Sequence, residues 1–278
     1  MRFTFFLNLI FLNAWLVTGC ATSYKKVALN EDDFKGKPVA IINSVPFVEQ
    51  TTKLCGPTAL YMVAKPHKSE LTLEEVRAIT FTPAARGTFK QDLLAASRRI
   101  GLAPYAVDSV PHLFEYLSQG TPVVIFHKTE FLWKQYWHYS VITGYNRLTE
   151  KFQVHIGEDP NHDISFSKII GSWEEGGKWA YVVQPPGKLP AQALFQEALD
   201  NSFAFLRLGY EDAAYQLSEE ILKRWPERYE ADVIMAQALM KKNQHLKALQ
   251  FLERASLKRP ENVMLREKIY ELSKGERL

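Results

Sequence analysis

The sequence predicts an α+β domain followed by an all-α tail. Between residues 38 and 185, helical patterns come first and β-rich runs second, which is the order typical of an α+β domain. The turn-rich segment Gln184-Pro-Pro-Gly-Lys-Leu-Pro190 then interrupts both helix and strand, and every later segment has helical periodicity. The chain has 278 residues, of which 46% are hydrophobic, enough to build one or two packed cores.

The N-terminal segment has the layout of a secretory signal. Arg2 precedes an apolar run from Phe3 to Val17, which is too short to span a bilayer of about 30 Å. The run ends in Val17-Thr18-Gly19-Cys20, which resembles the bacterial lipobox. This resemblance implies that residues 1–19 are removed and that Cys20 is acylated, for example with palmitate. We therefore expect a lipoprotein with a linker over residues 20–37, anchored in the cell envelope and facing the periplasm or the cell exterior. Ala21 after the cysteine favours the outer membrane by the same resemblance.

Local signals place the elements of the first domain. Pro57 suits a first helical turn, Gly101 closes a helix, and Gly120-Thr-Pro122 introduces a strand. We expect helices over residues 57–64, 73–79, 91–100 and 110–117, and strands over residues 39–42, 123–127, 138–144, 152–156 and 179–183.

The tail, residues 186–278, repeats with a period of 34 residues. Pro226 and Pro260 each end a helix and are 34 residues apart, and small residues match at the same offset. This pattern resembles the tetratricopeptide repeat, a helix-turn-helix unit of the same length. The resemblance implies two units, at about residues 195–228 and 229–262, and a capping helix over Val263 to Leu272. The matched pairs are Ser202 with Ala236, Ala204 with Ala238, and Ala214 with Ala248.

Charge excludes one class of partner. The net charge is +3, from 34 basic and 31 acidic side chains that are spread along the chain rather than clustered. Because no basic stripe is present, we expect no nucleic acid as a partner. We expect instead a peptide or protein substrate, a protein segment on the helical repeats, and the membrane through the lipid anchor.

A single thiol remains in the mature chain. If Cys20 carries lipid, Cys55 has no disulfide partner, although exported domains usually pair their cysteines. Cys55 stands before Gly56-Pro57 and a helical pattern, which places its sulfur at a helix N-terminus. The helix dipole and a neighbouring imidazolium would lower the thiol pKa. We therefore predict a reactive cysteine, with Gly56 leaving room for a substrate backbone.

Three other residue types would complete a nucleophilic site. The base should be a histidine at a strand end, and His138 fits best, with His127 as the alternative. Asp159 follows the next β-run and is the first candidate to orient the imidazole, because a third group must fix its tautomer. Glu158 and Asn161 remain alternatives for that role. An oxyanion donor is also needed.

Gln50 lies five residues before Cys55, and its amide is the candidate oxyanion donor. Together, Val45-Pro-Phe-Val-Glu-Gln50, Cys55-Gly-Pro57 and His138-Tyr-Ser-Val-Ile-Thr-Gly144 resemble the C39-type cysteine peptidases of the papain-like clan. The resemblance covers roughly residues 40–185. It implies a papain-like α+β fold and a triad of Cys55, His138 and Asp159, with Gln50 as oxyanion donor. The whole layout also resembles a group of bacterial C39-family lipoproteins.

Other functions remain open at this point. A degenerate peptidase fold would act as a peptide-binding adaptor, and a related catalytic fold would act as an amidase or acyltransferase. Better-known C39 domains belong to exporters and cut double-glycine leaders, but this chain has no transporter segment, so we do not expect that substrate. A zinc site is disfavoured because its candidate ligands lie around a Pro-Asn turn, and we expect neither metal nor cofactor. Those ligands would be His155, Glu158, Asp159 and His162.

Overall fold

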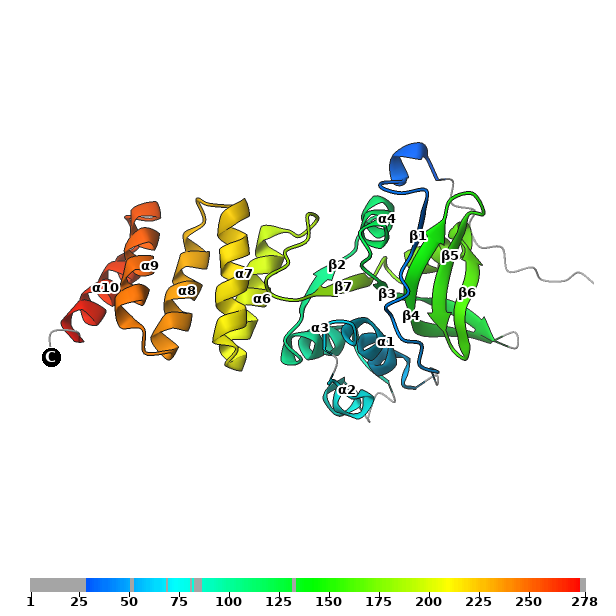
Figure 1. Ribbon diagram of the computed structural model, residues 1–278, viewed down its shortest axis with the longest axis horizontal. Coiled ribbons are helices and arrows are strands. Elements are labelled where there is room, and N and C mark those ends of the chain that lie inside the picture. Colours follow the sequence, from blue (N-terminus) through cyan, green and yellow to red (C-terminus); the bar gives the residue numbers. More distant parts are fainter. Residues whose placement is uncertain are drawn as a thin grey trace, which may run out of the picture.

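The computed structural model describes residues 29–50, 53–68, 70–80, 82, 87–131 and 134–275. The predicted signal segment, Cys20 and the first part of the linker lie outside these residues. An α+β domain forms one end of the molecule, and a row of helices extends from it to the C-terminus (Figure 1). No helix among the described residues is both long and apolar enough to cross a membrane.

The first domain is built on an antiparallel sheet, which confirms its predicted α+β class. The strand order is β2-β7-β3-β4-β5-β6, and β1 pairs with the C-terminal end of β4. The strands are β1 Val39–Ile41, β2 Ala103–Ala106, β3 Val123–Phe131, β4 Lys134–Asn146, β5 Lys151–Ile156, β6 Asp159–Ser165 and β7 Ala180–Gln184. The helical elements are η1 Glu31–Asp33, α1 Cys55–Ala64, α2 Leu73–Thr80, α3 Lys90–Arg99, α4 Val110–Ser118 and α5 Phe166–Glu175.

Besides the short η1, three elements of this domain are absent from the sequence-based prediction. β2 contains Pro104, which cannot donate to a ladder, yet its pairing with β7 places the strand at the edge of the sheet. β6 is exposed and polar apart from Ile164, so it lacks the apolar alternation of a strand. The third element is α5, which follows β6 directly. β3 and β4 also extend further than predicted, as a hairpin whose outer part includes the exposed aromatic residues Tyr136 and Trp137.

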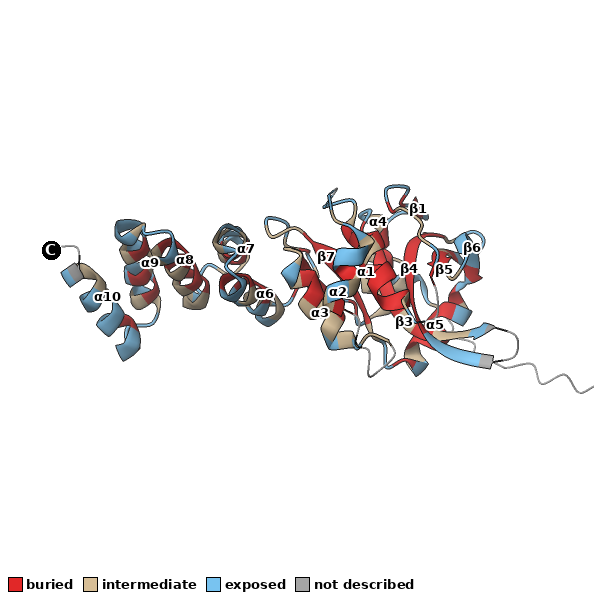
Figure 2. Ribbon diagram, turned by 90° about the horizontal axis from the view of Figure 1, so that it is seen from below, coloured by how far each residue is buried: buried red, intermediate tan, exposed pale blue. Residues whose placement is uncertain are grey.

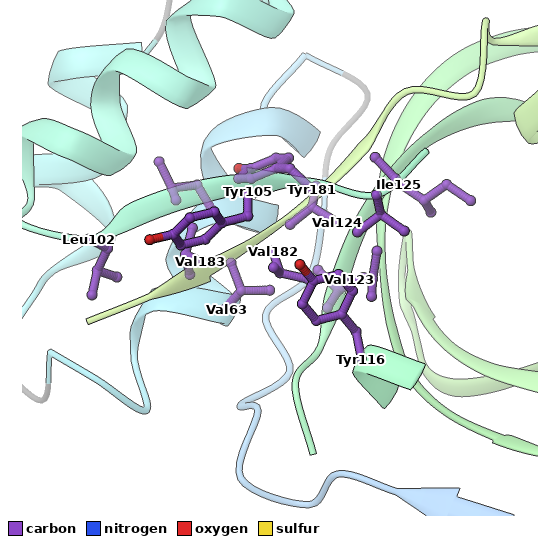
Figure 3. Close-up of a cluster of buried hydrophobic side chains, with 14 of the residues drawn as sticks. Val63, Leu102, Tyr105, Tyr116, Val123, Val124, Ile125, Tyr181, Val182 and Val183 are labelled. Carbon is purple, nitrogen blue, oxygen red and sulfur yellow. The ribbon is translucent and has the colours of Figure 1, made fainter. Parts of the chain in front are cut away.

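Helices cover the sheet on both sides. α1 packs against β4, β3 and β7, whereas α5 packs against β3, β5 and β6. The inner sides of these helices and the central strands are buried, and the outer helix faces are exposed (Figure 2). Within the core, Tyr105, Tyr116 and Tyr181 lie among valines of the central strands (Figure 3). This core holds the N-terminus of α1 against β4, where the candidate site lies.

The tail consists of five helices in the part of the chain that the structure describes. α6 and α8 begin 34 residues apart, and so do α7 and α9. The bounds are α6 Phe195–Leu208, α7 Glu211–Arg224, α8 Tyr229–Lys241, α9 His245–Lys258 and α10 Val263–Gly275. α6 also packs on the first domain, because Asn201 is fully buried and donates a 2.8 Å hydrogen bond to the carbonyl of Pro104. The first helices of the tail therefore share one core with the domain.

Candidate active site

Cys55 is the first residue of α1 and is buried beside β4. Leu54 precedes the helix in a non-helical conformation, and Pro57 occupies the first turn. The backbone N–H groups of Tyr139, Gly56 and Cys55 itself all form hydrogen bonds to the sulfur. The sequence therefore predicts correctly that the thiol lies at a helix N-terminus.

Gly56 lies where α1 packs closely against two neighbouring residues. A Cβ at this position would lie 2.9 Å from Cβ of Thr88 and 3.3 Å from the ring of Tyr139. Atoms at 2.9 Å cannot be accommodated without a shift of Thr88. The glycine is needed because α1 packs closely against these two residues.

Gln50 connects the cysteine to the histidine. Its side-chain Nε2 donates to the carbonyl oxygens of Cys55, at 3.3 Å, and Tyr139, at 3.2 Å. Its Oε1 accepts from the N–H of Gly157 at 3.3 Å and lies 3.0 Å from Nε2 of His138. Both amide hydrogens thus point at backbone carbonyls, so the oxyanion role predicted for Gln50 requires this amide to leave them.

His138 and Tyr139 lie where β4 is open on one side. β5 pairs with β4 only from Val141 onward, and Gln50 occupies the space next to the preceding residues. The backbone N–H of Gln50 donates to the carbonyl of Gly157 at 2.8 Å, which ties this segment to the end of β5. The segment at Gln50 thus fills the space where β4 and β5 are no longer paired, and this buries the site.

Burial shifts the pKa values of both reactive groups toward their neutral forms. Desolvation raises the pKa of the Cys55 thiol above its ordinary value, and the hydrogen bonds from Tyr139, Gly56 and Cys55 only partly oppose this. Desolvation also lowers the pKa of His138 to about 4. A neutral thiol and a neutral imidazole are therefore the resting state at pH 7. Burial thus disfavours the predicted thiolate–imidazolium pair, because the hydrogen bonds to the sulfur offset only part of the loss of water and His138 gains no compensating charge.

His127, the alternative base, is held by two hydroxyl groups. It lies opposite His138 on β3, with Nε2 2.9 Å from Oγ of Ser140 and Nδ1 3.3 Å from Oγ of Ser172. Burial lowers its pKa to about 3. Because both ring nitrogens are engaged by side chains of the core, His127 fits a structural role.

Asp159 lies apart from the ring it was expected to orient. It is exposed at the start of β6, where its carboxylate is 3.0 Å from Nδ1 of His162. The Nε2 atom of His138 is bonded instead to Gln50. The structure thus brings together Cys55, His138 and Gln50 and leaves Asp159 outside their hydrogen bonds.

Two contributors to the site are missing from the sequence-based prediction. Gly157 and Tyr139 act through their backbone groups, which no side-chain pattern reveals. Only Gly157 leaves a trace, as a glycine after the β-run with φ of 57°, a left-handed conformation that favours this residue. Among the described residues, no three His, Cys, Asp or Glu side chains are grouped so that they could hold a metal ion.

The sequence of the α+β domain matches a known protein family. The profile of the Peptidase_C39 like family matches residues 42–181, which is half of the chain and includes Gln50, Cys55 and His138. The chain therefore belongs to this family. The comparison with curated protein sequences found no match.

Three solved structures are similar to part of the chain. A structure described as a C39-like peptidase from Bacillus anthracis is 16% identical, with a TM-score of 0.42, and the alignment covers 52% of this chain and 97% of that one. The peptidase domain of Streptococcus ComA, a bi-functional ABC transporter, is 22% identical with a TM-score of 0.40, over 50% and 97% of the two chains. A double-glycine-motif protease from an AMS/PCAT transporter, solved with its leader peptide, is 18% identical with a TM-score of 0.36, over 52% and 94%.

Proposed function

We propose that this protein is a membrane-anchored, extracytoplasmic cysteine peptidase with Cys55 as nucleophile and His138 as base. The observation that carries the proposal is the buried amide of Gln50, which hydrogen-bonds both the backbone of Cys55 and the ring of His138. A nucleophile and a base within reach of one amide, inside a domain of the Peptidase_C39 like family, fit acyl transfer from a peptide bond.

The neutral resting state supports general-base catalysis. As the sulfur of Cys55 attacks the carbonyl carbon of the substrate, His138 takes the thiol proton, so the thiolate forms only during attack. The N–H groups of Cys55 and Gly56, which already point at the sulfur, are donors for the developing oxyanion. The C–N bond then breaks, and the amine leaves with the proton from His138. Water hydrolyses the resulting thioester with His138 as base again, releasing a carboxylic acid and restoring the thiol.

The remaining parts of the proposal concern location and partners. The lipobox-like segment supports a lipid anchor at Cys20, with the outer membrane favoured in a cell that has one. The 34-residue spacing of the tail helices supports a tetratricopeptide-like repeat that binds a protein segment. A cleft of about 490 Å³ along α6, α8 and α10 would provide the surface for it; its lining includes Phe203, Val233, Ile234, Met264 and Leu265.

The test uses the full-length protein in membranes. Wild type, Cys55→Ala and His138→Ala are incubated with a peptide library, and the products are identified by mass spectrometry. A peptide aldehyde, whose addition to Cys55 needs a base that takes the thiol proton, labels Cys55 separately. We expect peptides that only the wild type cuts. Labelling of Cys55 without any cut peptide would favour an amidase or acyltransferase. Neither labelling nor cleavage would favour a non-catalytic adaptor.

A further inference from the structure

The amide of Gln50 is buried and fully hydrogen-bonded. A primary amide offers two donors and two acceptor lone pairs, and all four are used here, by two carbonyls, one N–H and one imidazole. Only 5% of the residue is exposed, so water does not compete for these positions. The orientation of this amide is therefore under strong constraint.

The backbone decides which amide atom faces His138. If the amide were reversed, its oxygen would lie against the carbonyl oxygens of Cys55 and Tyr139, and its NH₂ group would face the N–H of Gly157. Each of these buried contacts would leave polar groups unsatisfied, which costs about 1–3 kcal/mol per group. Since backbone groups cannot exchange the roles of donor and acceptor, they hold Oε1 toward His138.

The orientation of the amide in turn fixes the tautomer of His138. An amide oxygen can only accept, so Nε2 of His138 must carry the hydrogen that fills the 3.0 Å contact. In a neutral ring the other nitrogen, Nδ1, then has the lone pair. Nδ1 is thus left as the nitrogen that can take a proton from the thiol.

Among the described residues, no carboxylate forms a hydrogen bond with the ring of His138 that could orient it. The titratable groups near this part of the sheet are Cys55 of α1, His127 of β3, Tyr139 of β4, His155 of β5, Lys168 of α5 and Asp92 of α3. The carboxylate of Asp92 accepts a hydrogen bond from Thr82 and acts on Tyr139 rather than on His138. Burial alone accounts for the lowered pKa of His138. A neutral amide orients a ring without adding the negative charge that would oppose this shift.

We propose that Gln50 is the third member of the catalytic group: its amide oxygen positions His138 and keeps the hydrogen on Nε2, and Asp159 has no part in this. The proposal rests on the function proposed above and assigns Gln50 a positioning role, whereas the sequence predicts an oxyanion donor. The exposed pair of Asp159 with His162 then serves the β5–β6 turn.

The first test reads the tautomer by ¹⁵N NMR of the full-length protein in detergent, labelled at histidine. The signals of His138 are assigned by their loss in His138→Gln. At pH 7 we expect hydrogen on Nε2 and none on Nδ1 in the wild type and in Asp159→Asn, and a mixture of tautomers in Gln50→Ala. Hydrogen on Nδ1 in the wild type, or a tautomer that responds to Asp159→Asn and not to Gln50→Ala, would overturn the proposal. Because this measurement needs no catalytic turnover, it can refute the role of Gln50 without refuting the proposed peptidase activity, and the reverse.

The second test replaces the neutral acceptor by a charged one. Gln50→Glu should raise the pKa of His138 by more than one unit. The pH below which kcat/KM falls should rise by the same amount. Gln135→Glu is the matched control, because it adds the same charge at an exposed position of β4. It should change the pH below which kcat/KM falls far less. If Gln50 serves only the oxyanion, Gln50→Ala and Gln50→Glu should both lower kcat by about 10²–10³-fold at every pH with the tautomer unchanged. If Gln50→Ala does not fold, the pKa of His138 in Gln50→Glu distinguishes the positioning role of Gln50 from the oxyanion role.

Discussion

His127 lies directly opposite His138 on the paired strands β3 and β4, and both rings are buried. Each ring is neutral in the folded state, since burial lowers the pKa to about 3 for His127 and to about 4 for His138. The proximity of His138 lowers the pKa of His127 further, because two positive charges would repel one another. The pair thus links the candidate site to the stability of the domain.

This histidine pair predicts a loss of stability in acid. An unfolded histidine takes up a proton near pH 6.5, whereas these two remain neutral in the folded state until about pH 4 and 3. Stability is therefore fully present above pH 6.5 and falls as the pH drops toward 4, by about 2–3 kcal/mol for each histidine between pH 7 and 4.5. Urea unfolding at both pH values should show that His127→Gln loses less stability on acidification than the wild type. His245→Gln, at an exposed position, serves as the control. Equal losses in all three proteins would contradict the prediction.

The neutral resting state predicts different pH profiles for two reactions of Cys55. Alkylation by iodoacetamide requires the thiolate, so it should stay slow at pH 7 and rise only at a higher pH than for a free thiol, because burial raises the thiol pKa. Peptide hydrolysis should instead lose rate only near pH 4, where His138 becomes protonated and can no longer act as base. His138→Ala should abolish hydrolysis and leave the alkylation profile nearly unchanged. Rapid alkylation of the wild type at pH 6 would show a preformed ion pair and refute this description of the site.

A separate prediction concerns the lipid anchor. Cys20→Ser removes the only residue at which the lipobox-like segment can be acylated, so the protein should move from the membrane fraction to the soluble fraction. Fractionation followed by immunoblotting measures this, and mass spectrometry of the mature N-terminus identifies the lipid. Cys55→Ser serves as the matched control, because it also removes a thiol but should leave the protein in the membrane. Release of both variants, or of neither, would argue against the anchor.

Local signals were sufficient to place Cys55 at the start of a helix and His138 on a strand. Pro57 and the apolar pattern after it predict that a helix begins at Cys55, and the β-run ending in Gly144 predicts the strand that carries His138. Both features depend on neighbours a few residues away, which is the range over which capping and alternation act. The fold class is predicted for the same reason, from the order of helices and strands.

The side chain that contacts the ring of His138 could not be predicted in this way. Gln50 and His138 are 88 residues apart, and their contact depends on where β5 leaves β4 and on the backbone of Gly157. Asp159 has the right residue type at a plausible distance along the chain, but β6 turns it toward His162 and solvent. Which polar group reaches a ring is decided by tertiary packing, which a single sequence does not reveal.

The contact between the tail and the domain predicts a sensitive position at Asn201. Its buried amide accepts from Nε of Arg98 at 2.7 Å and donates to the carbonyl of Pro104 at 2.8 Å. Asn201→Ala leaves both partners without this contact, so we expect a loss of about 1–3 kcal/mol in the free energy of unfolding. Asp200→Ala, at the exposed neighbouring position, should change it by less than about 0.5 kcal/mol. Chemical denaturation measures both variants, and equal effects would show that the hydrogen bonds of Asn201 do not stabilise this contact.

The small residues of the tail predict that its helices have no room for larger side chains. Ala248 in α9 is completely buried in a cluster that includes Ala236, Leu239 and Leu265. A larger side chain there forces the helices apart or into strained rotamers, so Ala248→Trp should destabilise the tail by about 1–3 kcal/mol. Leu257 lies on the same helix and is 83% exposed, which makes Leu257→Trp a control that adds the same ring without overpacking. Differential scanning calorimetry of the full-length protein should show a lower transition temperature for Ala248→Trp alone. An unchanged transition would mean that α8 and α9 do not pack as tightly as their small residues indicate, and the repeat assignment would lose its support.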